Sequence, residues 1–323
     1  MTWLLTGGAG YIGAHVALAL KASGRSVVAL DDLSSGVPER LPADVPLVRA
    51  SVLDEDAVRR AVREHRVTGV VHLAAKKAVA ESVADPLLYY RENVGGLEVL
   101  LRVLRDEGVE QMVFSSSAAV YGMPDVDLIT ESSPTEPINP YGESKLVGEW
   151  MLRDSARAFG LRWASLRYFN VAGAGSDALA DTGVNNLVPL VFRALDRGES
   201  PQVFGGDYPT PDGSCVRDYI HVADLADAHV AAADWLEGGA AAGTYNVGRG
   251  EGSSVLEVLA VTREVTGIDV EPKLVDRRPG DPARLVASAA AIERDLGWTA
   301  RRDLRDMVSS AWQGWRFVQQ PTS

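Results

Sequence analysis

Short apolar runs rich in β-branched residues alternate with longer amphipathic segments through the first half of the 323-residue chain. The apolar runs have the length of strands, and the segments between them have helical spacing. The runs begin at Thr2, Ser26, Pro46, Gly69, Gln111 and Arg162. Alternation of strands with helices is typical of βαβ units, and strands without a polar face indicate a sheet covered on both sides. The pattern predicts an α/β fold with a doubly wound parallel sheet.

The first expected strand leads into a glycine-rich turn, with Gly7, Gly10 and Gly13 before a helical pattern. Glycines at this place allow a tight turn and a close approach of the backbone to a pyrophosphate at the helix N-terminus. The second expected strand ends in Asp31, 18 residues after Gly13 (31 − 13), close to the spacing of a carboxylate that binds a ribose 2′-hydroxyl. A carboxylate there repels the additional phosphate of NADP, so the sequence predicts a site for NAD.

The regular alternation ends after residue 169, where stretches rich in Gly, Pro and Asp such as "VAGAGSDALADTG" indicate loops. We therefore expect a Rossmann domain over residues 1–169 and a smaller substrate-binding domain over most of 170–323. A strand and helix near 217–236 are expected to return to the first domain.

Composition narrows the class of protein. The net charge of −12 disfavours a broad nucleic-acid-binding face, and no apolar stretch reaches the roughly 20 residues that cross a bilayer. The N-terminus lacks the basic region of a signal peptide, and the one cysteine, Cys215, suits a reducing compartment. The five histidines have no ligand spacing. We expect a cytoplasmic protein without a metal site, nucleic acid or membrane as partner.

Hydroxyl groups and a lysine mark the second half of the expected sheet. The fifth strand runs into Ser115, Ser116 and Ser117, and "NPYGESKL" carries Tyr141 and Lys145 one helical turn apart. Ligands of doubly wound sheets bind at the carboxyl ends of the strands. From spacing alone, Tyr141 and Lys145 are either a packed surface pair or a proton-transfer pair.

Together with the glycine turn, the Ser…Tyr-x-x-x-Lys arrangement resembles the extended short-chain dehydrogenase/reductase superfamily. The stretches "TGGAGYIGAH", "FSSSAAVYG", "NPYGESKL", "LRYFN", "FGGDYPTPDGSCVRDYIHVADLADAH" and "RRPGDPA" are similar to the UDP-glucose 4-epimerase (UDP-galactose 4-epimerase) family within it, and the similarity covers nearly the whole chain. The resemblance implies an isomerase that oxidises C4 of a UDP-hexose with tightly held NAD, turns the 4-keto sugar, and returns the hydride to its other face.

The same resemblance implies the catalytic residues. Tyr141 is the expected base, Ser117 contacts the sugar 4-oxygen and relays the proton, and Lys145 holds the nicotinamide ribose. A free tyrosine has a pKa of about 10, so ionisation near neutral pH needs a lowered pKa, which Lys145 and the nicotinamide charge are expected to supply.

The binding residues are carried over one by one from the matching stretches. The expected cofactor contacts are Gly7, Gly10, Tyr11, Ile12, Gly13, Asp31, Asp32, Ser35, Gly36, Ser51, Val52, Leu73, Ala74, Ala75, Lys77, Asn93, Ser115, Tyr141, Lys145 and Phe169. The expected UDP-sugar contacts are Ser117, Tyr141, Asn170, Asn186, Leu187, Gln202, Val203, Phe204, Arg217, Arg278, Asp281 and Leu285. Arginine pairs such as Arg217 and Arg278 suit the diphosphate.

Three positions depart from the family pattern. Ser51 replaces the acidic residue that usually addresses the adenine, and Ala75 stands where glycine is common. Leu285 stands where the family has a bulky Tyr or a smaller Cys beside the sugar. Its intermediate volume keeps an N-acetylhexosamine epimerase, or an epimerase of a specialised pathway, as an alternative.

Other functions on this fold are less well supported. A 4,6-dehydratase needs an acid–base pair after the serine, where this chain has Ala118 and Ala119, and a uronate epimerase needs a further cation that the sequence does not reveal. A non-catalytic NAD sensor is free to lose Ser117, Tyr141 or Lys145, yet all three are present. The apolar stripes of the helices expected near 92–108 and 141–160 are either core or, as in related epimerases, the interface of a homodimer.

Overall fold

The computed structural model describes residues 1–183, 186–269, 271–278 and 280–319. Its larger part is built on a seven-stranded sheet of order β10-β6-β5-β4-β1-β2-β3, in which every neighbouring pair is parallel. The strands are β1 (Thr2–Thr6), β2 (Ser26–Asp31), β3 (Leu47–Arg49), β4 (Gly69–His72), β5 (Gln111–Ser117), β6 (Arg162–Tyr168) and β10 (Ala242–Val247). The six strands expected from the first half are present, and the prediction of a doubly wound parallel sheet is confirmed.

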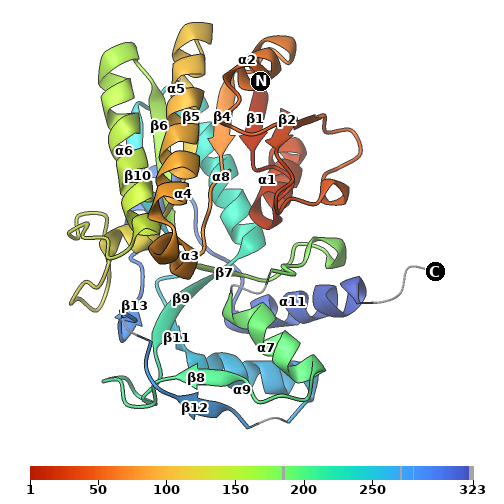
Figure 1. The fold of residues 1–323 in the computed structure, drawn as a ribbon, viewed down its shortest axis with the longest axis vertical. Coiled ribbons are helices and arrows are strands. Elements are labelled where there is room, and N and C mark those ends of the chain that lie inside the picture. Colours follow the sequence, from red (N-terminus) through yellow and green to blue (C-terminus); the bar gives the residue numbers. More distant parts are fainter. Residues whose placement is uncertain (184–185, 270, 279, 320–323) are drawn as a thin grey trace.

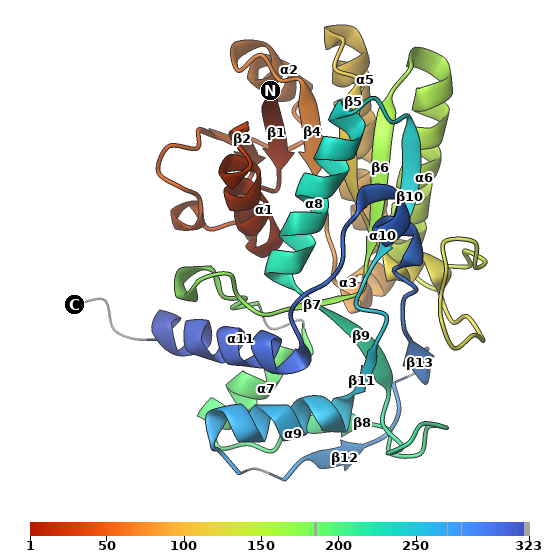
Figure 2. The same ribbon diagram turned by 180° about the vertical axis from the view of Figure 1, so that it is seen from behind.

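Helices cover both faces of this sheet (Figures 1 and 2). One face carries α1 (Tyr11–Ala22) and α8 (Val222–Glu237), and the other carries α2 (Glu55–Glu64), α5 (Gly96–Glu107) and α6 (Pro140–Phe159). Each layer has its own apolar core, because the strands present buried side chains to both sides. The apolar stripe of α5 belongs to the second of these cores.

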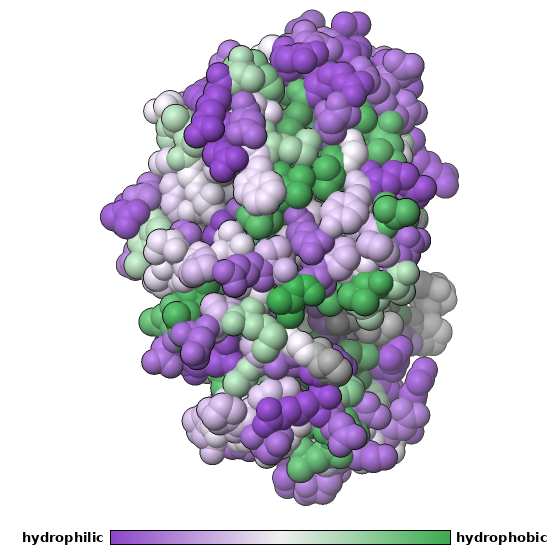
Figure 3. All heavy atoms as spheres, turned by 60° about the vertical axis from the view of Figure 1, so that its left-hand side comes forward, coloured by the Kyte–Doolittle hydropathy of each residue, from purple (hydrophilic) through white to green (hydrophobic). Residues whose placement is uncertain are grey.

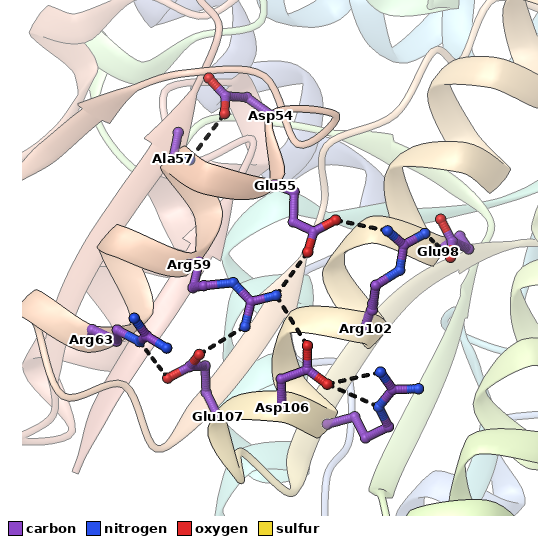
Figure 4. Close-up of polar contacts among 10 residues, drawn as sticks. Asp54, Glu55, Ala57, Arg59, Arg63, Glu98, Arg102, Asp106 and Glu107 are labelled. Carbon is purple, nitrogen blue, oxygen red and sulfur yellow. Dashed lines mark hydrogen bonds and ion pairs between the residues drawn. The ribbon is translucent and has the colours of Figure 1, made fainter.

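A network of charged side chains joins α2 to α5 on the outside of the sheet (Figure 4). Arg59 of α2 binds Glu107 at 2.8 Å and Asp106 at 3.0 Å, and Glu55 binds Arg102 at 2.7 Å. Because several charges share partners, the network fixes the two helices against each other more firmly than isolated surface pairs do. The outer face of α5 is thus occupied by contacts within the chain.

The smaller part lies below the carboxyl ends of the large sheet in Figure 1. Its four-stranded sheet contains β7 (Asn170–Ala172), β9 (Val216–His221), β11 (Gly252–Ser254) and β13 (Arg284–Leu285), and a second sheet pairs β8 (Gln202–Phe204) with β12 (Lys273–Val275). Three helices, α7 (Leu187–Asp196), α9 (Val255–Thr266) and α11 (Leu304–Val318), supply its apolar core. The short elements are η1 (Pro38–Arg40), α3 (Val79–Ala84), α4 (Pro86–Tyr89), η2 (Tyr90–Gly95), η3 (Ala118–Tyr121), η4 (Asp177–Leu179) and α10 (Ala290–Leu296).

The strand and helix expected near 217–236 lie in different parts. Helix α8 packs beside α1 on the large sheet, where its buried alanines, including Ala228 and Ala232, allow a close approach. Strand β9 instead pairs with β7 in the smaller sheet, which differs from our expectation for the strand. The strand that joins the large sheet is β10, which pairs with β6. The chain therefore passes between the two parts more than once, and a single boundary at residue 169 does not separate them.

Candidate active site

The turn between β1 and α1 is packed so closely that Gly7 and Gly13 cannot carry side chains. Gly7 has a φ of +70°, and a Cβ added to it would lie 2.8 Å from the backbone nitrogen of Ala74. A Cβ on Gly13 would lie 2.2 Å from the carbonyl oxygen of Gly7. Gly10 is the N-cap of α1, and within the described residues no side chain caps this first turn. The N–H groups at the start of α1 are therefore available to an anion, as a pyrophosphate site requires.

Asp31, at the end of β2, is held in a fixed position beside this turn. Its Oδ2 atom accepts the Ala9 N–H at 3.0 Å, and its Oδ1 atom accepts the Leu33 N–H at 2.8 Å. A Cβ on Gly36 would lie 2.6 Å from Oδ1, so the loop after β2 passes directly over the carboxylate. Burial raises the pKa of Asp31, and the two backbone N–H groups oppose that rise.

A cavity of about 370 Å³ runs across the carboxyl ends of the central strands. Most of the expected cofactor contacts line it, namely Gly7, Gly10, Tyr11, Ile12, Gly13, Asp31, Asp32, Ser35, Ser51, Val52, Leu73, Ala74, Ala75, Lys77, Ser115, Tyr141 and Lys145. These residues come from the ends of strands β1 to β5, from the loops that follow them, and from α1 and α6. Their convergence follows from the parallel sheet, which brings all the carboxyl ends to one edge.

Three expected cofactor contacts are not among the described residues that line the cavity. Gly36 contacts Asp31, as described above. Asn93 holds the loop at Lys76, accepting the Lys76 N–H at 2.8 Å and donating to the Lys76 carbonyl at 3.0 Å. Phe169 packs in a buried cluster with residues that include Val120 and Leu146. In this structure Asn93 and Phe169 support the residues around the cavity.

A strap, residues 177–183, reaches this cavity, and no pattern in the sequence indicated it. Asp181, Thr182 and Gly183 line the cavity together with Arg40 of the loop after β2. The Arg40 Nη2 atom donates to the Ala180 carbonyl at 3.0 Å and to Thr182 Oγ1 at 3.2 Å. These partners are 140 and 142 residues apart in the chain. No local motif marks such a contact. Lys76, Glu92 and Tyr168 also line the cavity without having been predicted.

Helix α6 carries Tyr141 and Lys145 to the inner end of the cavity. It begins at Pro140, behind an N-cap in which the Asn139 side chain accepts the Gly142 N–H at 2.9 Å. The Lys145 Nζ atom donates to the Ser115 carbonyl at 2.7 Å. Both side chains line the cavity and Lys145 is almost fully buried, so the pair is not a solvated surface contact.

Burial controls the protonation of this pair. It lowers the pKa of Lys145 to about 7 and raises the pKa of Tyr141, whereas interaction with the Ser117 hydroxyl lowers the Tyr141 pKa. The resemblance implied a lowered Tyr141 pKa, and the chain by itself produces the opposite net direction. The physical reason is that the same desolvation disfavours the ammonium and the phenolate.

A buried ion pair anchors α6 to the sheet behind these residues. Glu149 of α6 binds Arg167 of β6 through two bonds, at 2.9 Å and 2.6 Å, and also accepts the Ser116 hydroxyl at 2.6 Å. Such bidentate pairs fix orientation as well as distance. The position of Tyr141 and Lys145 above the sheet is therefore set by polar contacts as well as by apolar packing.

A second cavity, of about 420 Å³, lies in the smaller part of the molecule. Of the expected UDP-sugar contacts, Asn170, Leu187, Gln202, Phe204, Arg217, Arg278 and Asp281 line it. The Arg278 guanidinium lies 3.6 Å from the centre of the Phe204 ring, and Arg217 pairs with Asp281 at 3.5 Å. Arg193, Arg197, Cys215 and Tyr219 line the same cavity and were not predicted.

The other expected substrate contacts lie elsewhere. Asn186 and Tyr141 line the first cavity, and Val203 is buried in β8. Leu285 is half-buried in β13 and packs against the cluster that contains Phe169. Ser117 ends β5, and its Oγ atom accepts the Ala119 N–H at 3.1 Å. Val203, Leu285 and Ser117 are not among the described residues that line either cavity.

Neither a cluster of metal ligands nor a membrane-spanning helix is found in the described ranges. They contain no group of three or more His, Cys, Asp or Glu side chains arranged to hold a metal ion. None of the helices described is both long and apolar enough to span a bilayer.

Comparison with known proteins identifies the family. The sequence model of the NAD dependent epimerase/dehydratase family matches residues 3–248. The UDP-glucose 4-epimerase of Azospirillum brasilense is 48% identical over 322 residues, covering 98% of this chain and 92% of that protein. The UDP-glucose 4-epimerase of Corynebacterium glutamicum is 45% identical over 315 residues, covering 97% and 95%.

A solved structure gives the same result. The UDP-glucose-4-epimerase of Stenotrophomonas maltophila, crystallised with bound NAD and formylated UDP-arabinopyranose, is 40% identical. It superimposes with a TM-score of 0.94 over 98% of each chain. The chain therefore belongs to the NAD dependent epimerase/dehydratase family.

Proposed function

We propose that this protein is an NAD-dependent UDP-glucose 4-epimerase, which interconverts UDP-glucose and UDP-galactose. One observation carries the proposal: Tyr141 and Lys145 line the same cavity as the glycine turn and Asp31. A proton-transfer pair and a dinucleotide site in one cavity are what a transient oxidation requires. The identities of 48% and 45% with named UDP-glucose 4-epimerases favour this reaction over that of an N-acetylhexosamine epimerase.

The cofactor is NAD, and the residues of the first cavity fit it. The uncapped first turn of α1 suits a pyrophosphate, and Gly10 leaves the backbone open to it. The Asp31 carboxylate suits a ribose 2′-hydroxyl and disfavours a 2′-phosphate. When bound, NAD would supply a reversible hydride acceptor and the positive charge of its oxidised ring.

The chain itself supplies the proton transfer. As the phenolate, Tyr141 takes the proton of the sugar 4-hydroxyl on its Oη atom and returns it at the end of the cycle, and the Ser117 side chain interacts with this Oη atom. Lys145, held by the Ser115 carbonyl, places a titratable amine within the same cavity. Ser117 and Tyr141 thus form a short path for one proton between protein and sugar.

The second cavity supports the choice of a nucleotide sugar. Four guanidinium groups line it, from Arg193, Arg197, Arg217 and Arg278, against two carboxylates, from Glu199 and Asp281. The excess of positive charge is local, because the whole chain has a net charge of −12. It suits a diphosphate, whose oxygens match the guanidinium fork.

A dehydratase is disfavoured by the residues after Ser117. Ala118 and Ala119 begin η3 there, and neither side chain can donate or accept a proton. A sensor without catalysis is disfavoured because Ser117, Tyr141 and Lys145 are all retained, with Tyr141 and the buried Lys145 lining one cavity.

In the deciding experiment, the purified protein is given UDP-galactose as substrate, and the UDP-glucose that forms is measured by NMR. We expect conversion without added oxidant or reductant, and transient absorbance from reduced nicotinamide. Tyr141→Phe should lack both signals. Absence of product from UDP-galactose and from UDP-glucose, in protein that contains NAD, would exclude the epimerase.

A homodimer is the expected assembly. Several apolar side chains of α3, α4 and α6 are exposed, including Val83 (64%), Leu87 (76%) and Trp150 (47%). Figure 3 brings this side forward and shows apolar surface across the middle of the face. Because the stripe of α5 is already buried, these residues are the better candidates for covering by a second copy.

Light scattering tests the assembly. We expect the mass of a dimer for the wild type and of a monomer for Leu87→Glu combined with Trp150→Glu. Phe317→Glu, an equally exposed site on α11, should remain a dimer. A wild-type monomer at every concentration would refute the proposal.

The single cysteine, Cys215, supports our placing of the enzyme in the reducing cytoplasm.

A further inference from the structure

Tyr168 and His229 form a buried pair beside the first cavity. Tyr168 ends β6 and lines the cavity, whereas His229 lies on α8 with none of its surface exposed. The Tyr168 hydroxyl is hydrogen-bonded to His229 Nε2, and the two rings meet edge to face at 5.4 Å. In its second contact, His229 Nδ1 lies 2.9 Å from the Leu225 carbonyl oxygen, which is hydrogen-bonding distance.

The partners of His229 determine where its proton lies. The Leu225 carbonyl can only accept, so His229 Nδ1 carries the hydrogen. Burial lowers the pKa of His229 to about 4, so the ring is neutral at physiological pH and Nε2 is an acceptor. Burial raises the pKa of Tyr168, so its hydroxyl keeps the proton. The Tyr168 hydroxyl therefore donates to His229, away from the cavity.

This direction leaves the Tyr168 oxygen with only lone pairs to offer any further partner. The Ser115 side chain interacts with the same hydroxyl, and Ser115, Tyr141 and Lys145 line the same cavity. A tyrosine hydroxyl has one proton to donate, and His229 takes it. Toward a ligand, Tyr168 can therefore only accept a hydrogen bond.

We propose that His229 is a positioning residue that turns the Tyr168 hydroxyl away from the cavity, so that the cavity selects a dinucleotide whose ring substituent carries an amide N–H. The inference rests on NAD as the cofactor. NAD has such an amide, and 3-acetylpyridine adenine dinucleotide keeps the carbonyl but has a methyl group in place of the amine.

Competition between these two dinucleotides tests the inference on the full-length protein. Protein loaded with either dinucleotide is incubated with an equimolar mixture of the two until both samples reach the same ratio of bound dinucleotides. Mass spectrometry measures that ratio. We expect His229→Phe and Tyr168→Phe each to lower the preference for NAD by about three- to tenfold, the loss of one hydrogen bond. His229→Gln, which can still accept from Tyr168, should retain most of the preference.

Matched controls separate this role from general destabilisation. Tyr121→Phe removes another buried hydroxyl, bonded to Asn246 and Arg167 away from the cavity, and should leave the ratio unchanged. The double variant of Tyr168 and His229 should lose no more than the larger single loss, because both act through one bond. A wild-type ratio in both His229→Phe and Tyr168→Phe overturns the inference. If the wild type holds neither dinucleotide, the cofactor assignment fails instead.

Discussion

Lys145 donates from its Nζ atom to the carbonyl oxygen of Ser115 at 2.7 Å, which joins α6 directly to the carboxyl end of β5. The nitrogen also lies 5.2 Å from the centre of the Phe114 ring. Apart from this carbonyl and this ring, Lys145 is surrounded closely enough that burial lowers its pKa from 10.5 to about 7. Protonation of the buried Lys145 therefore lowers the stability of the fold, while it places a positive charge in the site.

Lys145→Met should change how stability depends on pH. The folded-state pKa is below the unfolded one, so the cost of burying the ammonium is complete below pH 7 and is relieved as pH rises from about 7 to about 10. We expect the difference in melting temperature, variant minus wild type, to be largest near pH 6 and to decrease toward pH 10. Thermal unfolding of both proteins, freed of dinucleotide, measures it. A difference that is independent of pH would show that the folded state does not perturb Lys145.

Tyr141→Phe should lower turnover by about 100-fold or more, because it removes a general base and acid while leaving the ring in place. The bound NAD content should stay the same, which absorbance of the purified protein checks. Tyr90→Phe is the control, since the Tyr90 hydroxyl is bonded to Glu143 at the surface. Near-normal turnover of Tyr141→Phe would assign the proton transfer to another group.

Asp31→Asn should weaken NAD binding by about tenfold or more and reduce the preference for NAD over NADP. The carboxylate accepts two backbone N–H groups as an ion, and hydrogen bonds to charged groups are the stronger ones. Titration calorimetry with each dinucleotide measures both effects. Asp44→Asn, an exposed carboxylate paired with Lys21, should change neither. An unchanged preference for NAD would remove Asp31 from cofactor selection.

Arg40→Ala should release NAD faster, by about tenfold, because it removes the two hydrogen bonds that hold the strap at Ala180 and Thr182. Turnover per bound NAD should be unaffected, since the described hydrogen bonds of the Arg40 side chain go to the strap and not to Ser117, Tyr141 or Lys145. Loss of NAD during timed dialysis measures the rate. Arg49→Ala, which removes an exposed arginine at the end of β3, is the control. Equal loss from both variants would mean that the strap does not retain the cofactor.

The sequence by itself determined the features that depend on short stretches of chain. The apolar runs predicted the six strands β1 to β6, because a strand buried on both faces must be apolar along its length. The glycine turn and Asp31 were found because a tight turn requires glycine at fixed spacing. Tyr141 and Lys145 were recognised as a pair because the helical repeat alone sets their separation.

Only the tertiary structure decided the features that join distant segments. Whether Tyr141 and Lys145 are solvated or buried, and hence which way each pKa moves, depends on what packs over them. The strap reaches Arg40 across 140 residues, and His229 reaches Tyr168 across 61, so no local pattern marks either contact. The placement of β9 in the smaller sheet was likewise outside the reach of periodicity, because an apolar strand pairs equally well in either sheet. Local spacing fixed the chemistry of the residues, and long-range packing fixed their protonation, their direction and their neighbours.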